Sequence, residues 1–265
     1  MDIFISLPAQ TLELYEGARL LARYRVSSAE RGAGEERDSF MTPRGRHLIR
    51  AKIGSGCPEN TVFAARRPTG ERWTPELAAE FPGRDWILTR ILWLSGCEPG
   101  RNRLGRVDTM RRYIYLHGTP DTVSLGEPGS RGCLRMSNRD IIDLFDRVTA
   151  YTFVNIGDFR IAAGRKCDNA LEVQAADDSG SPIARCLANE QGLIAEIEVS
   201  ETWRRKGIAR QLLRALVELA TESGIAGLAI DSPRYLEAMC LGMGFLPRAG
   251  STGQGLALKL RTVPA

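Results

Sequence analysis

One histidine and one cysteine near the middle of the chain have the residue types of a nucleophile and its base. His117 ends an apolar, strand-like segment, and Cys133 follows sixteen residues later in a Ser-Arg-Gly-Cys turn. A thiol with an ordinary pKa of ~8.5 is mostly protonated at neutral pH, so it needs a base or positive surroundings before it attacks a carbonyl. The pair suggests thiol-dependent acyl transfer, although a lone His and a lone Cys at such a spacing are more often structural.

Arginines and a glycine surround this cysteine. Arg131 and Arg135 can lower the pKa of the thiol and can hold a substrate carboxylate through paired hydrogen bonds. Gly132 permits a tight turn, and the amides that lead into Cys133 can donate to an oxyanion. We therefore expect a thiolate in a positively charged turn that binds an anionic substrate.

A second chemical pattern lies within residues 193–213, which read LIAEIEVSETWRRKGIARQLL. A strand leads into a loop of the form Arg-x-x-Gly-x-Ala, made by Arg204, Gly207 and Ala209, and a helix follows. Free amides at a helix N-terminus, with positive charge beside them, suit a pyrophosphate. So short a pattern is also commonplace at helix starts that bind nothing.

The elements that must position these residues differ between the two halves of the chain. In the first half, apolar and polar residues alternate, which predicts strands at 3–7, 12–15, 20–26, 46–53, 87–94 and 112–116. Ser137 and Asp140 then form a capping box, and the helix expected after them has an apolar face of Ile141, Leu144, Phe145 and Val148. A mostly-β domain therefore closes near residue 156.

The second half mixes strands and helices. Strands are expected near 159–163, 170–175, 183–187, 193–199, 226–230 and 256–261, with helices at about 207–223 and within 233–242. This order predicts an α/β (α+β) fold. A length of 265 residues suits two domains, and we expect them at 1–156 and 157–265.

Composition excludes several classes of protein. Hydrophobic residues make up 43% and charged residues 26% of the chain, which is typical of a folded globular protein. No apolar run approaches the length of a membrane span, and no export signal follows Met1, so we expect a cytoplasmic protein, or a periplasmic one if another route exports it. The net charge of +4 is spread thinly over the first half, so we expect an anionic small substrate rather than nucleic acid.

Cysteine and histidine usage argues against a disulfide scaffold and against a metal site. The six cysteines are scattered and include no Cys-x-x-Cys pair, and His47 and His117 are the two histidines. We expect reduced thiols and no bound metal, and we interpret His47 as structural.

The residues around the histidine and cysteine resemble the signature of the L,D-transpeptidase (YkuD-like) catalytic domain. The matching segments are His117-Gly118-Thr119 and Ser130-x-Gly132-Cys133-x-Arg135-Met136, and further segments agree in order across residues 1–156. The resemblance implies a mostly-β fold without a cofactor. It also implies that the cysteine attacks the carbonyl between the third residue of a peptidoglycan stem tetrapeptide and its terminal D-Ala, and that a carbapenem can acylate the same thiol.

The resemblance assigns a role to each of these positions. Cys133 is the nucleophile, His117 the base, and Gly118 the group that orients it through a backbone carbonyl. Ser130 and Gly132 shape the turn, and Arg135 grips the substrate carboxylate. The family usually carries a second histidine where this chain has Arg131, which leaves the acyl acceptor open: an amine or water.

The second half resembles the GNAT acetyltransferase fold, on the strand, loop and helix of residues 193–213 and on Met243-Gly244-Phe245. This resemblance implies acetyl-CoA, with its pyrophosphate on the amides of residues 204–209 and its pantetheine against strand 194–199. The implied binding residues are Ile197, Val199, Arg204, Arg205, Lys206, Gly207, Ile208 and Ala209. Cys240 stands where the family often has a tyrosine general acid, and Pro233 lies near the position of its usual asparagine. Glu196 or Glu198 is a candidate base or a solvated carboxylate.

Three interpretations follow. The first domain is an L,D-transpeptidase on stem peptides or muropeptides, and the second acetylates an amine. Alternatively, the first domain binds stem peptides for a catalytic second domain. In the third, the second domain binds CoA without catalysis.

Overall fold

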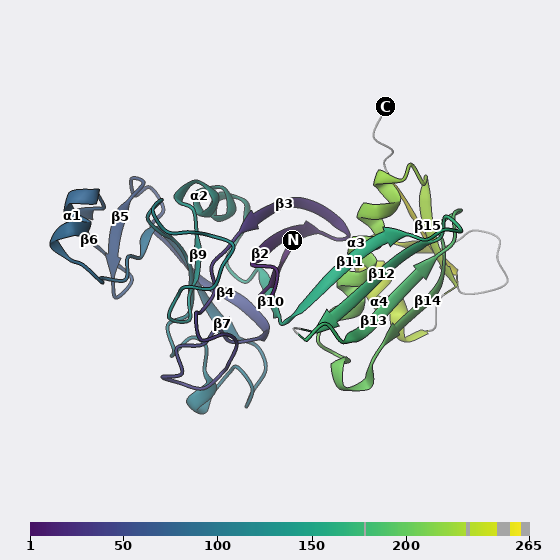
Figure 1. Ribbon diagram of the computed structural model, residues 1–265, viewed down its shortest axis with the longest axis horizontal. Helices are drawn as coiled ribbons and strands as arrows, with labels where there is room; N and C mark the ends of the chain where they lie inside the picture. Colours follow the sequence, from purple (N-terminus) through teal and green to yellow (C-terminus); the bar gives the residue numbers. More distant parts are fainter. Residues whose placement is uncertain (178, 232–233, 248–254, 261–265) are drawn as a thin grey trace. The chain divides into compact units, whose positions relative to one another are not determined.

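The computed structural model describes residues 1–177, 179–231, 234–247 and 255–260 (Figure 1). The chain divides into two compact units, one of residues 1–14 and 22–158 and the other of residues 15–21 and 159–265. The expected boundary after residue 156 lies two residues before the main division. Within the described residues, no helix is long and apolar enough to cross a membrane.

The first unit is built on a ten-stranded sheet, in which most strands run in the order β3-β2-β1-β10-β4-β7-β5-β6. Strand β8 pairs with β7 and β9. The pairs β1–β10 and β8–β9 are parallel, whereas β10–β4, β4–β7, β5–β6, β5–β7 and β7–β8 are antiparallel. This is the mostly-β fold that the sequence predicts. The bounds are β1 (Asp2–Ser6), β2 (Thr11–Glu16), β3 (Arg19–Arg25), β4 (Gly45–Ile53), β5 (Thr61–Ala64), β6 (Arg67–Arg72), β7 (Leu88–Gly96), β8 (Tyr115–Gly118), β9 (Leu134–Met136) and β10 (Phe153–Gly157).

The helix expected after Ser137 is confirmed. Helix α2 (Asn138–Arg147) begins after Ser137, whose side chain accepts a hydrogen bond from the amide of Asp140 at 3.0 Å. The expected apolar face, with Ile141 and Leu144 at its centre, is buried. The helix thus closes the first unit against strands β7 and β8.

A hairpin and a short helix between residues 57 and 86 have no counterpart in the sequence analysis. Strands β5 and β6 and helix α1 (Pro75–Glu80) fill this segment. The turn of the hairpin is formed by Ala65 and Arg66, both with positive φ (45° and 66°), where glycine or asparagine is the usual signal. Strand β6 is mostly exposed, so it also lacks the alternation that marks a half-buried strand.

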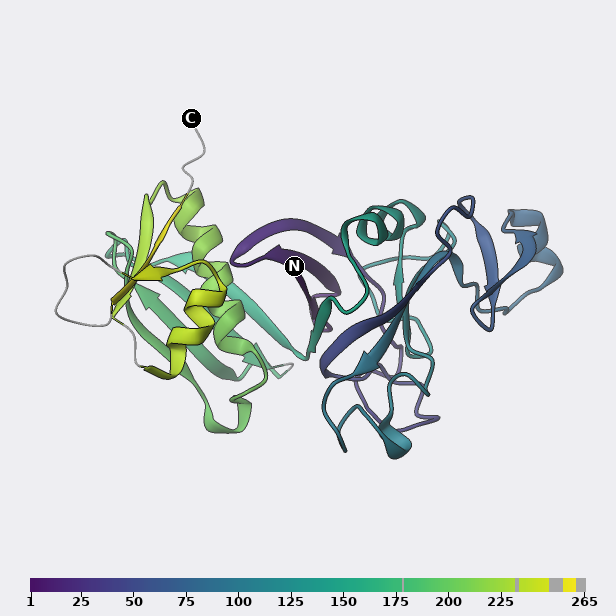
Figure 2. The same ribbon diagram turned by 180° about the vertical axis from the view of Figure 1, so that it is seen from behind.

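The second unit holds a seven-stranded sheet in the order β11-β12-β13-β14-β15-β17-β16. Helices α3 (Ile208–Glu222) and α4 (Arg234–Gly242) lie on the same face of this sheet (Figures 1 and 2). The predicted α/β fold is confirmed, and residue 261 of the last expected strand lies outside the described residues. The strand bounds are β11 (Phe159–Arg165), β12 (Leu171–Asp177), β13 (Pro182–Ala188), β14 (Leu193–Val199), β15 (Gly227–Asp231), β16 (Leu246–Pro247) and β17 (Gly255–Lys259).

The hairpin tip of residues 15–21 belongs to the second unit, although the sequence analysis assigned it to the first domain. Arg214 of α3 is fully buried, and its guanidinium lies 3.9 Å from the centre of the Tyr15 ring. Its Nε and Nη2 both donate to the carbonyl of Gly17, at 3.2 and 2.9 Å. These contacts explain why the tip groups with α3.

Candidate functional site

Strands β8 and β9 place the predicted nucleophile and base on one side of the sheet. In their parallel register His117 pairs with Arg135, and Cys133 directly precedes β9. Residues paired across neighbouring strands point to the same face, as do residues two apart along a strand. The side chains of His117, Arg135 and Cys133 therefore share a face, with Tyr115 beside them.

The histidine is held in one tautomer. His117 is 1% exposed, and its Nδ1 lies 2.8 Å from the carbonyl oxygen of Gly118. Because a carbonyl only accepts, Nδ1 carries the proton and Nε2 keeps its lone pair. Burial lowers the pKa of His117 and outweighs the opposite effect of the Gly118 hydrogen bond. The imidazole is therefore a neutral base at pH 7.

The cysteine differs from expectation. Burial raises the pKa of the Cys133 thiol to about 12, against a backbone hydrogen bond from Tyr115 and the charges of Arg135 and Arg112, which lower it. The positive surroundings predicted a thiolate, and this expectation is contradicted, because burial disfavours the charged form of the thiol more than the arginines favour it. The thiol, with Sγ 3.5 Å from the carbonyl oxygen of Tyr113, needs a base to give up its proton.

The turn before the cysteine is fixed by hydroxyl groups. Ser130 Oγ donates to the carbonyl of Cys133 and accepts from the amide of Gly132 at 3.1 Å. The hydroxyl of Thr42 donates to the carbonyl of Gly132 at 3.0 Å. Gly132 has φ +124°, which side chains rarely adopt. Since its amide is already bonded, the amide of Cys133 is the better candidate for an oxyanion donor.

The arginine expected to grip a carboxylate already holds one. Arg135 Nη2 lies 2.7 Å from Oδ1 of Asp85, and Nη1 donates to the carbonyl of Gly129 at 2.8 Å. Asp85 was not predicted as a partner of Arg135, because it lies fifty residues before Arg135 in a segment without a motif. Arg131, by contrast, is exposed.

The other histidine has a structural environment. His47 is fully buried, and its ring nitrogens lie 3.0 Å from the carbonyl oxygen of Gly45 and 3.0 Å from Thr109 Oγ1. Burial lowers its pKa to about 4. In the part of the chain that the structure describes, no group of three or more His, Cys, Asp or Glu side chains is placed to hold a metal ion.

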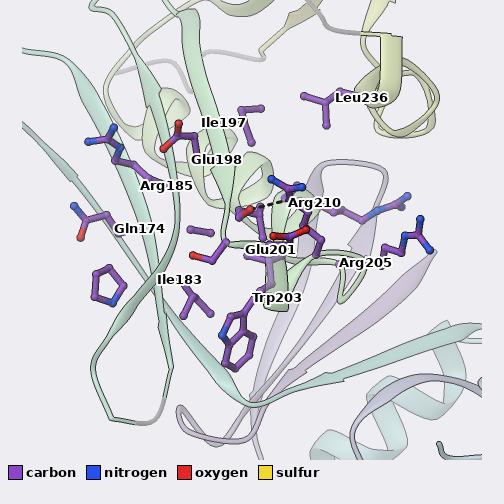
Figure 3. Close-up of a pocket in the computed structure, with 18 of the residues that line it drawn as sticks. Gln174, Ile183, Arg185, Ile197, Glu198, Glu201, Trp203, Arg205, Arg210 and Leu236 are labelled. Atoms are coloured by element: carbon purple, nitrogen blue, oxygen red, sulfur yellow. Dashed lines mark hydrogen bonds between the residues drawn. The ribbon is translucent and has the colours of Figure 1, made fainter.

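The second unit contains a pocket of about 1340 Å³ beside the start of α3 (Figure 3). One wall is the outer half of β14, which among the described residues pairs with β15 only at Leu193 and Ile194. Beyond these residues, that side of β14 pairs with no residue that the structure describes. Ile197 and Val199 lie in this wall.

The start of α3 forms another wall. Gly207, with φ +81°, caps the helix without a side-chain hydrogen bond, which leaves the first amides of the helix available. Arg204 Nε donates to the carbonyl of Val199 at 3.2 Å and ties the loop to β14. The expected binding residues that line the pocket are Ile197, Val199, Arg204, Arg205, Gly207, Ile208 and Ala209. Lys206 instead places its Nζ 3.9 Å from the centre of the Trp203 ring.

Several lining residues were missed by the sequence analysis, namely Gln174, Arg185, Glu201, Trp203 and Arg210. Their positions depend on pairing between strands and on the loop before α3, and no local pattern marks them. Figure 3 shows Arg185 and Glu198 close to each other on neighbouring strands, in agreement with the register.

The two candidate carboxylates on β14 differ. Glu196 forms an ion pair with Arg185, and this hydrogen bond lowers the pKa of Glu196, so it is a poor base. Glu198 is exposed and lines the pocket. Cys240 is fully buried, which raises its pKa and makes it unsuitable as a general acid in the pocket. Pro233 lies outside the described residues.

Comparison with known proteins assigns a family model to each unit. A model described as the L,D-transpeptidase catalytic domain (YkuD) matches residues 1–156, and a model of the GNAT acetyltransferase family matches residues 150–237. Both matches agree with the two resemblances found in the sequence, so the predicted fusion is confirmed.

Individual proteins show the same similarity. A Bacillus licheniformis protein provisionally named L,D-transpeptidase YkuD is 27% identical over 154 residues, which is 58% of this chain and 64% of that protein. The chain thus spans less than two thirds of this curated relative. The L,D-transpeptidase of Xylanimonas cellulosilytica is 18% identical, with a TM-score of 0.35 and 59% of each chain covered. A GNAT family N-acetyltransferase (YhbS) of Escherichia coli, solved with CoA, is 21% identical, with a TM-score of 0.29 over 34% of this chain and 59% of that one.

Proposed function

The chain belongs, through residues 1–156, to the L,D-transpeptidase (YkuD) catalytic domain family, and on that premise we propose that it is a cysteine-dependent acyltransferase acting on peptidoglycan stem peptides. The observation that supports this most is the shared face of His117, on β8, and Cys133, directly before β9, with the Nε2 lone pair of His117 left free because Nδ1 donates to Gly118. A neutral base on the same face as a protonated thiol suits nucleophilic catalysis, in which the base activates the thiol.

The reaction follows from these groups. Nε2 of His117 takes the proton from Sγ of Cys133 while the sulfur bonds to the carbonyl carbon before the terminal D-Ala. The amide of Cys133 donates to the oxyanion that forms. The C–N bond then breaks, the proton passes from His117 to the departing D-Ala amine, and an acyl thioester remains. An amine or water then attacks the thioester, which releases the acyl group and restores the thiol.

The test is the release of D-Ala from a stem tetrapeptide. We expect turnover by the wild type and none above background by Cys133→Ala, and we expect His117→Gln to lose roughly 10²–10⁴-fold in rate. Cys57→Ala is a matched control, because Cys57 packs against the same cluster of Phe63, Ile91 and Tyr115 as Cys133. Full activity in Cys133→Ala contradicts the assignment. Binding of the peptide without turnover favours the stem-peptide-binding alternative.

We propose as a second function that the second unit binds acetyl-CoA and acetylates an amine. When bound, acetyl-CoA supplies an activated acetyl thioester. Its anionic and extended parts suit the residues present: Arg204 and Arg205 beside the open start of α3, and the unpaired edge of β14 along the same pocket. Of the two candidate carboxylates on β14, Glu198 is the one that lines the pocket, and we assign it the role of taking a proton from the amine.

Calorimetry with acetyl-CoA tests the binding. Ala209→Glu puts a negative charge at the start of α3, and we expect it to weaken binding at least about tenfold. Arg160→Ala, on the exposed side of β11, is a control that leaves binding unchanged. Absence of binding by the wild type overturns this function. A Glu198→Gln variant that binds acetyl-CoA and loses acetyl transfer to an amine separates catalysis from a CoA-binding module.

A further inference from the structure

The guanidinium of Arg135 is engaged by a carboxylate of the chain itself. Asp85 Oδ1 accepts from Nη2 at 2.7 Å, and the side chains of Arg135 and Asp85 are 15% and 35% exposed. The contact uses one oxygen of Asp85 and one nitrogen of the arginine. Paired Arg–carboxylate contacts with two hydrogen bonds are stronger, so a substrate carboxylate that binds through two oxygens can replace Asp85.

Asp85 is held in place by its neighbour in the chain. Trp86 is buried and packs with Val62 and Leu88, which anchors the segment that carries Asp85. The charge of Asp85 reaches the reacting groups, since it raises the pKa of both Cys133 and His117. The carboxylate is therefore part of the electrostatic environment of the nucleophile.

Two buried polar atoms beside this ion pair are left with an unused hydrogen-bonding position. In the described part of the chain, Nε of Arg135 and Oγ of Ser27 are buried without a hydrogen-bond partner. Both residues border Gly129, whose Cβ, if it had one, would lie 3.5 Å from Ser27 Oγ and 3.9 Å from Arg135 Nη1. Unsatisfied buried polar groups are costly, so the hydrogen bonds around Arg135 are incomplete while Asp85 is its partner.

We propose that Asp85 is a specificity-determining residue that occupies Arg135 until the carboxylate of the donor peptide displaces it. This inference rests on the proposed acyl transfer at Cys133. It means that donors with a free carboxylate next to the scissile bond are selected over amidated or esterified ones, because a neutral donor leaves the Asp85–Arg135 pair closed. Once displaced, Asp85 moves toward solvent, where its charge is hydrated.

Alkylation of Cys133 tests the electrostatics without a peptide substrate. Iodoacetate carries a carboxylate and iodoacetamide is its neutral analogue, and both consume the same thiolate, so the ratio of their rates reports charge near the sulfur. Peptide mass spectrometry resolves Cys133 from the exposed Cys167, which serves as an internal reference. We expect Asp85→Asn to raise the iodoacetate-to-iodoacetamide ratio at Cys133 about threefold to tenfold, and to leave it unchanged at Cys167.

The control removes a similar ion pair away from the site. Glu71 pairs with Arg84 at 2.7 Å and its side chain is 34% exposed, so Glu71→Gln matches Asp85→Asn in burial and in charge change. Asp85→Glu keeps the charge and should retain the wild-type ratio. If Asp85→Asn does not fold, Asp85→Ser is measured in its place. An unchanged ratio at Cys133 in a folded variant overturns the proposal.

Peptide turnover completes the test. With a tetrapeptide donor we expect Asp85→Asn to lower KM about threefold or more for the free carboxylate and to leave KM unchanged for the C-terminal amide. An equal change for both donors contradicts selection by charge. If the protein turns over neither peptide, the proposed function fails, while the alkylation ratio still decides whether Asp85 masks Arg135.

Discussion

At the scale of single residues, the pair proposed to react is a protonated thiol and a neutral imidazole. Burial sets both states, since it raises the pKa of Cys133 to about 12 and lowers that of His117. The raised pKa favours the protonated thiol at neutral pH, so in the proposed reaction proton transfer accompanies attack. This protects the nucleophile from adventitious reagents, because the thiolate is the reactive form.

The pH dependence of alkylation checks this directly. A raised pKa means that the thiolate fraction of Cys133 at neutral pH is smaller than that of an ordinary cysteine and is still rising at pH 10. We expect the rate with iodoacetamide to increase about tenfold per pH unit from pH 7 to 10 without a plateau. Mass spectrometry of the Cys133 peptide measures this rate. A plateau near pH 7 would show a stabilised thiolate and contradict the account.

At the scale of elements, the site depends on β8, β9 and the helix that follows them. Asn138 at the start of α2 accepts from Thr89 Oγ1 at 2.6 Å and donates to Asn60 Oδ1 at 2.9 Å, so the helix start is bonded to β7 and to the loop before β5. Gly118, the last residue of β8, lies directly against the side chain of the same asparagine. The position of α2 is therefore coupled to that of the Gly118 carbonyl, which accepts a hydrogen bond from His117.

Removal of the α2 cap is expected to destabilise the first unit. Ser137→Ala deletes the acceptor for the amide of Asp140 and costs about 1 kcal/mol, or about 2–4 °C in Tm for a domain of this size. Thr74→Ala is the control, because Thr74 caps α1, which contains no buried residue. Equal thermal shifts for both variants would show that α2 contributes nothing beyond local capping.

A methyl group on Gly118 is expected to disrupt both packing and catalysis. Its Cβ would lie 2.4 Å from Asn138 Oδ1 and 2.8 Å from the carbonyl oxygen of Leu88. We expect Gly118→Ala to cost about 1–3 kcal/mol and to reduce turnover, because the carbonyl that orients His117 must shift. Gly164→Ala, where a Cβ meets nothing within 4 Å, should leave thermal stability nearly unchanged. Chemical denaturation of both variants decides the matter.

The sequence predicts the features that neighbouring residues determine, and it fails for the features that depend on residues distant in the chain. The Ser137 cap and the alternating strands are read from neighbouring residues, and the signature around Cys133 indicated the family. The thiol pKa was mispredicted because burial comes from residues distant in sequence. Asp85 reaches Arg135 across fifty residues, and the β5–β6 hairpin turns through Ala65 and Arg66, which carry no turn signal.

At the scale of the whole molecule, each unit has its own sheet, its own buried core and its own candidate site. The residues proposed to bind acetyl-CoA all belong to the second unit, and Cys133, His117 and Arg135 all belong to the first. The two proposed activities therefore share no residue, and we expect that each can be removed separately.

Separate variants should thus have separate effects. We expect Ala209→Glu to weaken acetyl-CoA binding and to leave the alkylation rate of Cys133 within about twofold of the wild type, whereas Cys133→Ala leaves the acetyl-CoA Kd unchanged. Calorimetry and alkylation on the same preparations measure both. A change of tenfold or more at the distant site would reveal coupling that the two-site account does not contain.

The central claim is that Cys133 is the acylated residue, and intact-protein mass spectrometry tests it most directly. Wild type, Cys133→Ala and the matched control Cys57→Ala are incubated with a stem tetrapeptide and, separately, with a carbapenem. We predict a covalent adduct on the wild type and on Cys57→Ala, and none on Cys133→Ala. An adduct that persists on Cys133→Ala, or its absence from the wild type with both compounds, would contradict the account.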